Sequence, residues 1–231
     1  MKFLAIIPAR KGSKRLPNKN RLLLGGKPLF EWSINSSKKV NNICDILVST
    51  DDEKIIEFCR KKDVLIPWKR PKELAKDTSS SVDACIHALD WYEDNVSKVN
   101  GVILLQPTSP FRTHKTIEKG ISLFKNNQDT TIVSVSKAKK KLEWMFQFNE
   151  NLFLKPLIEK KLNDGFKSQE TYVLNGALYI ISPQKLRNDK SFFGGKLKPI
   201  VMRSDVESID IDTLLDFELA KIVINNKMND K

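Results

Sequence analysis

The sequence contains no hydrophobic run that approaches the about 20 residues needed to cross a bilayer. Its first apolar stretch, residues 3–7, is too short for a secretory signal peptide. We therefore expect a cytoplasmic protein with no membrane partner. The chain has 231 residues, 40% of them hydrophobic, a length and composition that predict one domain over residues 1–231.

Cysteine and histidine are scarce. The three cysteines, Cys44, Cys59 and Cys85, form no CxxC pair, and we expect buried, reduced thiols. The two histidines, His87 and His114, fall in expected helices and have no cysteine or carboxylate at a zinc-ligand spacing. The sequence thus gives no sign of a zinc site or a disulfide framework.

Two familiar nucleotide-binding motifs are also missing. GxGxxG does not occur, and GxxxxGK[ST] is excluded because Gly25-Gly26-Lys27 is followed by Pro28. Dinucleotide dehydrogenases and P-loop enzymes are therefore disfavoured.

The chain carries a net charge of +12, which suits a nucleic-acid binder, a membrane-surface protein or an enzyme with polyanionic substrates. Much of the excess is lysine scattered through expected helices. The lysine-rich run, Lys137 and Lys139 to Lys141, is expected on a solvated loop. Charge alone does not choose among these classes.

Apolar, β-branched runs alternate with segments of helical periodicity. Strands are expected at residues 3–7, 43–48, 64–66, 102–105, 132–135 and 177–181, and a closing helix at 214–224. This alternation predicts an α/β fold with a doubly wound, mostly parallel sheet. Residues 142–172 break the rhythm and are expected to form a small insertion that pairs subunits or covers the substrate.

The strongest motif follows the first strand, at residues 6–20, IIPARKGSKRLPNKN. Ligands of α/β sheets bind beyond the carboxyl ends of the strands, so this loop should project into the site. Gly12 permits an open backbone there, while Arg10, Lys14 and Lys19 can neutralise a triphosphate. A merely basic surface loop is the alternative.

A second polar turn, residues 106–112, leaves the strand at 102–105. Gln106 and Thr108 offer neutral donors and acceptors that suit a pyrimidine or sugar hydroxyls, while Arg112 can support the loop or pair with a carboxylate. An ordinary proline-bounded turn explains this composition equally well.

Two further motifs are weaker. In SIDIDT, alternation along a short strand would point Asp210 and Asp212 to one face, where Mg²⁺ can bridge them to phosphates; alternatively, Asp212 caps the next helix. In RPKELAKDTSSS, residues 77–79 are expected as helix caps, and Arg70 and Ser81 as possible ribose or phosphate contacts.

Taken in order, IIPARKGSKRLPNKN, VSTDD, RPKELAKDTSSS, LLQPTSPFRT, NGALYI and SIDIDT resemble the CMP-sialic acid synthetase family, the acylneuraminate cytidylyltransferases. The resemblance spans nearly the whole chain. It implies a nucleotidyltransferase fold of Rossmann-like type, a homodimer, and CTP with Mg²⁺ in a transfer of CMP to an acidic nine-carbon sugar.

The resemblance also implies roles for individual residues. Arg10, Lys14, Asp210 and Asp212 would be catalytic, and the two aspartates would hold the metal. CTP would be bound by Arg10, Gly12, Ser13, Lys14, Lys19, Asn20, Arg70, Ser81, Gln106 and Thr108. The sugar would be bound by Gln106, Asn175 and Tyr179, with Lys167 or Gln169 replacing an arginine of the sialic acid-specific relatives.

The exact sugar is left open between sialic acid, legionaminic acid and close relatives. One alternative is the eight-carbon acidic sugar 3-deoxy-manno-octulosonate. Another, from a different class, is a non-catalytic RNA-binding protein, which should show a basic stripe interleaved with exposed aromatics. The basic residues cluster instead around one phosphate-sized loop, so we expect small-molecule substrates and no nucleic-acid partner.

Overall fold

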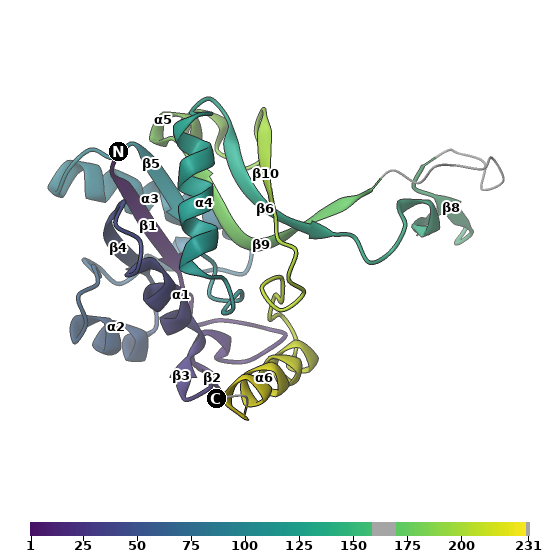
Figure 1. The fold of residues 1–231 in the computed structure, drawn as a ribbon, viewed down its shortest axis with the longest axis horizontal. Helices are drawn as coiled ribbons and strands as arrows, with labels where there is room; N and C mark the ends of the chain where they lie inside the picture. Colours follow the sequence, from purple (N-terminus) through teal and green to yellow (C-terminus); the bar gives the residue numbers. More distant parts are fainter. Residues whose placement is uncertain (159–169, 230–231) are drawn as a thin grey trace.

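A computed structural model describes residues 1–158 and 170–229. Its centre is a six-stranded sheet in the order β10-β6-β9-β5-β1-β4 (Figure 1). The strands are β1 (Phe3–Pro8), β4 (Ile43–Ser49), β5 (Gly101–Leu104), β6 (Thr131–Lys137), β9 (Tyr172–Ile181) and β10 (Leu197–Val201). All neighbours pair in parallel except β9, which is antiparallel to both β5 and β6. The predicted mostly parallel sheet is confirmed.

Helices cover both faces of the sheet. Alternate residues of β1 point to opposite faces: Phe3 belongs to one hydrophobic cluster and Leu4 to the other. The first cluster is completed by α1 (Leu29–Ser37), α2 (Glu53–Arg60) and α4 (His114–Lys125), and the second by α3 (Ser81–Asn95) and α5 (Pro183–Asp189). Helices on both faces of a largely parallel sheet make the fold doubly wound, as predicted.

A third, smaller cluster lies below one end of the sheet, where α6 (Leu214–Asn229) packs against the short hairpin β2 (Leu23–Leu24) and β3 (Lys27–Pro28) (Figure 1). It buries Leu16 from the basic loop and Ile211 from between the two aspartates. Because both side chains enter one apolar cluster, the basic loop and the acidic segment are drawn together although about 195 residues separate them.

Some local expectations were wrong. Residues 64–66 form no strand but a single bridge, Leu47 to Leu65. The segment around Asp210 is irregular, because Ile211 turns into the third cluster and its N–H bonds to the Thr108 carbonyl at 2.8 Å. Cys44 is exposed, whereas Cys59 and Cys85 are buried as expected. Short 3-10 turns lie at Lys19–Arg21, Lys72–Leu74 and Leu142–Trp144.

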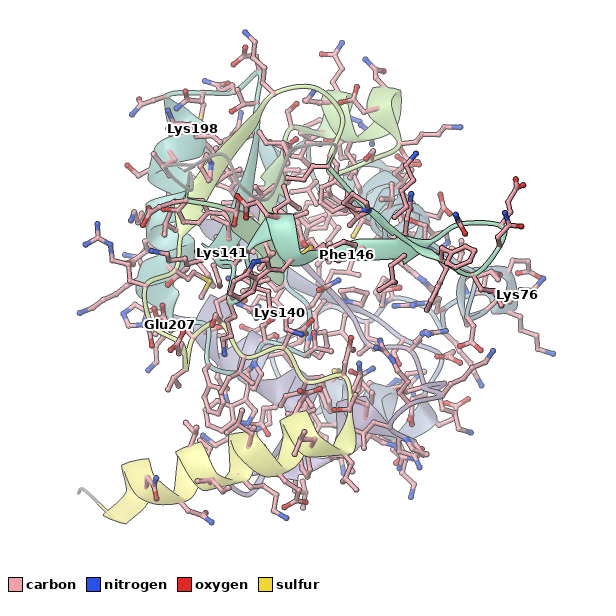
Figure 2. All side chains as sticks on the ribbon, turned by 90° about the vertical axis from the view of Figure 1, so that its right-hand side faces the viewer. Lys76, Lys140, Lys141, Phe146, Lys198 and Glu207 are labelled. Atoms are coloured by element: carbon pink, nitrogen blue, oxygen red, sulfur yellow. The ribbon has the colours of Figure 1, made fainter. Side chains whose placement is uncertain are left out.

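The insertion predicted at 142–172 projects from the body as an arm (Figure 1). It carries the hairpin β7 (Phe146–Phe148) and β8 (Leu154–Pro156), and Figure 2 shows Lys140, Lys141 and Phe146 on it, facing the viewer. The chain leaves from Lys137 and returns at Tyr172, and these two residues are paired in the sheet. Lys137 therefore ends β6, with an ion pair to Glu170, rather than lying on the expected loop.

Within the described ranges, no helix combines the length and apolar character that membrane crossing requires.

Candidate active site

An open pocket lies at the carboxyl ends of the parallel strands, with a volume of about 310 Å³. Its size falls at the lower end of the range for small-ligand sites. It contains Pro8 and Pro107, together with most of the residues predicted for the site: Arg10, Gly12, Ser13, Lys19, Asn20, Arg70, Ser81, Gln106, Thr108, Asp210 and Asp212. The structure therefore brings the basic loop and the acidic segment to one cavity, while their roles stay predictions.

The basic loop is fixed by backbone contacts rather than left open. The carbonyl of Ala9 accepts from the Thr50 hydroxyl at 2.5 Å, and the Asn20 amide donates to the Arg10 carbonyl at 2.8 Å. The N–H of Lys11 donates to Asp51 at 2.7 Å. Gly12 meets no heavy atom within 4 Å of an added Cβ, so its open backbone faces free space in the pocket. Such a held loop can receive an anion with little further ordering.

Arg10 and Lys14 share one carboxylate. The Arg10 guanidinium contacts Asp77 at 2.7 Å and the Lys14 ammonium contacts its other oxygen at 2.9 Å. Hydrogen bonds from Lys14 and then Arg10 hold the pKa of Asp77 below its ordinary value. Asp77 was expected as a helix cap, but that expectation was wrong: Ser80 caps α3, and its hydroxyl accepts from the N–H of Val82 at 3.0 Å. Asp77 instead occupies the two cations, Arg10 and Lys14, that were predicted to bind phosphate oxygens.

If CTP is the substrate, as the resemblance implies, we expect Asp77→Asn to lower its KM, because the triphosphate would no longer compete with a carboxylate for Arg10 and Lys14. Since these are surface ion pairs, the change should be about two- to fivefold. Initial-rate kinetics measure it, and Asp94→Asn, an exposed carboxylate on α3, is the control. A raised KM would mean that Asp77 orients the two cations instead of competing for them.

Asp212 is held by two cations. Its oxygens contact Arg15 at 2.7 Å and Lys19 at 2.8 Å. Partial burial raises the pKa of Asp212, but Lys19 and Arg15 outweigh burial, and the net pKa lies below the ordinary value. Its side chain does not cap α6: Thr213, directly before the helix, does so, and its hydroxyl accepts from the N–H of Asp216 at 3.3 Å.

Asp210 has the opposite environment. It lies at the mouth of the pocket, yet the surrounding walls desolvate its carboxylate and raise its pKa. A hydrogen bond from Thr108 opposes this shift, and the negative charge of Asp212 adds to it. No side-chain cation forms an ion pair with Asp210 in the described part of the chain. The two neighbouring aspartates are thus electrostatically distinct.

The donor set fits a hard cation that is completed by substrate. Within residues 1–158 and 170–229, no group of three or more His, Cys, Asp or Glu side chains could hold a metal ion. Mg²⁺ commonly takes only one or two carboxylates together with phosphate oxygens. Asp210 is the better ligand of the predicted pair, because both oxygens of Asp212 are engaged by cations.

Arg112 supports the turn that contains Gln106, which is one of the two roles predicted for it. The buried guanidinium donates to the Ala177 carbonyl at 2.6 Å, to the Ser33 hydroxyl at 2.7 Å and to the Gln106 carbonyl at 3.4 Å. Burial lowers the pKa of Arg112 to about 9. All three acceptors are neutral, so the alternative role, pairing with a carboxylate, is not seen among the described residues.

Arg70 has a comparable supporting position. It is buried, and its Nε donates to the Ser49 hydroxyl at 2.9 Å while its guanidinium also bonds to the Ser49 carbonyl. It joins β4 to the segment that leads into α3. Arg70 also lines the pocket, while its contact with ribose or phosphate stays a prediction.

Only some of the residues predicted to bind the sugar line the pocket. Gln106 lines the pocket, but Asn175 is buried, where it accepts from the Ser134 hydroxyl at 2.6 Å and donates to Ser136 at 2.8 Å. Tyr179 is also buried, with its ring 5.5 Å from that of Phe192. Neither side chain lines the cavity. Lys167 and Gln169 lie outside the described residues.

Sequence reasoning missed three contributors to the site. Arg15 and Asp77 form its ion pairs, and Gly176 approaches Gln106 so closely that an added Cβ would lie 2.6 Å from the amide oxygen. Arg15 had a signal, since it belongs to the basic loop. Asp77 and Gly176 lie in the quoted motifs RPKELAKDTSSS and NGALYI, but their contacts could not be predicted, because their partners lie about 67 and 70 residues away in the chain.

An α/β sheet with a cationic loop and an acidic pair at the carboxyl ends of its strands is the arrangement expected of a nucleotidyltransferase. A family model described as cytidylyltransferase matches residues 4–226. The chain belongs to the cytidylyltransferase family.

Named relatives agree with this family. The chain is 36% identical over 222 residues to the CMP-N,N'-diacetyllegionaminic acid synthase of Legionella pneumophila, covering 96% of this chain and 95% of that protein. It is also 36% identical to the N-acylneuraminate cytidylyltransferase of Escherichia coli, covering 99% of this chain but only 53% of the longer relative. Among solved structures, a CMP:2-keto-3-deoxy-manno-octonic acid synthetase complexed with CTP has the same fold, with a TM-score of 0.70, 15% identity, and coverage of 98% of this chain and 100% of the other.

Proposed function

We propose that this enzyme transfers CMP from CTP to an acidic nine-carbon sugar, a sialic acid, legionaminic acid or close relative, and releases pyrophosphate. The observation that carries the proposal is the single pocket in which the basic loop, the Gln106 turn and Asp210 meet. The relatives named for legionaminic acid and acylneuraminate support the acceptor class.

The chain's own groups bind and orient the reactants. Arg10, Lys14 and Lys19 would hold the phosphates and the departing pyrophosphate, after Arg10 and Lys14 exchange Asp77 for phosphate oxygens. The anomeric hydroxyl of the sugar attacks the α-phosphorus in line, its oxygen bonds to phosphorus, and the bond to the bridging oxygen of pyrophosphate breaks. Mg²⁺, when held by Asp210, would neutralise phosphate charge.

The Gln106 turn is suited to the junction of nucleotide and sugar. The Gln106 amide lines the pocket, and its main chain is fixed by Arg112. A neutral amide can both donate to and accept from hydroxyl or pyrimidine groups. Asn175 would act indirectly, by bonding to Ser134 and Ser136 and so fixing the strand that presents Gly176.

The direct test is pyrophosphate release with CTP and a panel of sialic acid, legionaminic acid and 3-deoxy-manno-octulosonate, with ATP, GTP and UTP as nucleotide controls. Release with CTP and a nine-carbon acid is expected. Preference for the eight-carbon acid would favour the alternative acceptor, which the CTP-bound structural neighbour suggests. RNA retained on filters with steep salt dependence, and no pyrophosphate release, would favour the RNA-binding alternative.

We infer that a second copy of this chain covers the arm. Its hairpin exposes large apolar side chains, with Phe148 70% and Phe153 71% exposed, and Trp144 and Leu152 are exposed as well. Contiguous exposed apolar surface of this kind marks an interaction site. Homodimer formation through the arm is favoured over a lid function, because the arm projects away from the body (Figure 1).

Phe148→Asp should therefore convert a dimer into a monomer, because a charge would be buried at the apolar contact. Light scattering coupled to size exclusion measures the mass. Val96→Asp, an equally drastic change at an exposed residue at the end of α3, is the control and should leave the dimer intact. A Phe148→Asp protein that stays dimeric would place the interface elsewhere.

A cytoplasmic location also remains our proposal. It is supported by the unpaired state of all three cysteines and by the intracellular nucleotide that the reaction requires.

A further inference from the structure

A second cavity, of about 570 Å³, lies on the far side of the Arg112 turn from the active-site pocket. One wall is the outer face of α1, where Trp32, Asn35 and Ser36 follow helical spacing, with Lys39 just beyond the helix end. The remaining lining residues come from the β2–β3 hairpin, the turn before α4, and α6: Gly25, Lys27, Pro110, Phe111, Arg112, Thr113, His114 and Ile224. Neither the basic loop nor the acidic pair reaches it.

The lining is positively charged and contains no carboxylate. Lys27 and Lys39 form no ion pair within the described part of the chain, and Arg112 adds a third cation. The cavity also meets the first turn of α4, which Thr113 caps and which carries no acidic residue. The partial positive charge of a helix N-terminus favours an anion at this point.

Arg112 contributes buried positive charge beside the cavity. It is 97% buried, with a relative exposure of 3%, and its Nε has no hydrogen-bond partner among the described residues. Its other contacts are to neutral oxygens of Ala177, Ser33 and Gln106. A buried guanidinium without a counter-ion carries a desolvation cost that an adjacent anion offsets.

Part of the remaining lining is apolar and aromatic. Trp32 and Phe111 meet edge to face with centroids 6.3 Å apart, and Ile224 packs beside them. The Lys27 ammonium lies 5.7 Å from the centroid of the Trp32 ring. An aromatic surface next to several cations suits a ligand with a flat ring at one end and negative charge at the other.

We propose that this cavity is a second ligand site, separate from the active site, which binds a small phosphate monoester that carries one planar ring. Three cationic side chains and a helix N-terminus favour a doubly charged phosphate over a single carboxylate. The ring would lie against Trp32 and Phe111. The proposal does not depend on which sugar the enzyme uses.

Phenyl phosphate is the probe, and the readout is the indole N–H signal of Trp32 in ¹⁵N-labelled protein, assigned with Trp32→Phe. Saturating CTP is present throughout, so that the active-site pocket is filled. We expect a saturable shift of the Trp32 signal. Inorganic phosphate, which lacks the ring, and phenol, which lacks the phosphate, should both bind more weakly.

Lys39→Glu should weaken phenyl phosphate binding by about tenfold, because one attraction becomes a repulsion. Lys38→Glu is the matched control: the same charge change one residue earlier, on a side chain that lines a different cavity, should leave binding unchanged. Three results would overturn the proposal: no saturable shift of Trp32, equal weakening by both substitutions, or inorganic phosphate binding as tightly as phenyl phosphate.

Discussion

Asp210→Asn should lower kcat by about 10²- to 10³-fold, the loss typical when one charge-stabilising group is removed from a transition state. The carboxylate is the only one of the predicted metal pair that is not engaged by a cation among the described residues. An amide keeps its shape but loses its negative charge, and with it the affinity for a hard cation. Pyrophosphate release at saturating CTP and sugar measures the effect.

The raised pKa of Asp210 predicts how the substitution affects stability, and so whether the loss of kcat could result from unfolding. Desolvation by the pocket walls raises that pKa although the residue is exposed, so the folded state favours the protonated form and ionisation at neutral pH lowers stability somewhat. Asn carries no such cost, and the Tm of Asp210→Asn should equal or exceed that of the wild type. In the wild type, kcat/KM on the acid side should fall with an apparent pKa above that of an ordinary aspartate, because kcat/KM reports the free enzyme, in which no cation of the described residues pairs with Asp210. Asp205→Asn, outside the pocket, is the control, and a near-normal rate for Asp210→Asn would remove Asp210 from the mechanism.

Gly176→Ala should lower kcat/KM by about 10²-fold, because misplacing a substrate-positioning group by about 1 Å has an effect of this order. The added Cβ would lie 2.6 Å from the Gln106 amide oxygen and 3.8 Å from Asp210, so the Gln106 side chain must leave its place in the pocket. The positive φ of 73° adds a backbone cost of roughly 1–2 kcal/mol.

Gly26→Ala is a matched control. Gly26 has a φ of 76° but no heavy atom within 4 Å of an added Cβ, so this substitution introduces the same backbone strain without the clash. The Tm of both variants should fall by a similar amount, while only Gly176→Ala should lower activity. Equal activity losses would show that strain alone, rather than the contact with Gln106, explains the effect.

Much of the fold could be predicted from the sequence. Buried parallel strands are continuous apolar runs, and β1, β4, β5 and β6 lie close to the predicted ranges because both of their faces are covered. Residues 64–66 gave the same signal but are too few to form more than one bridge. In SIDIDT, alternation suggested a strand, yet burial of Ile211 in the third cluster fixes an irregular segment instead.

The parts of the site whose functional residues are close together in the sequence could be predicted. The basic loop and the acidic segment could be named because their residues are neighbours in sequence. The pairing of Arg10 with Asp77, of Arg15 with Asp212 and of Gly176 with Gln106 could not, because each depends on how distant segments pack. Asn175 was identified from its motif, but its hydrogen bonds to β6, which keep it out of the cavity, become visible only in the folded chain.

The arm leaves and rejoins the sheet at one point. Lys137 and Tyr172 face each other across β6 and β9, and the next hydrogen bond outward joins Ala138 to Thr171 at 2.9 Å. A tight turn could therefore close the two strands in its place without rearranging the core. The arm can therefore be exchanged or reshaped in evolution, which would alter the proposed self-association and leave the sheet with its pocket unchanged.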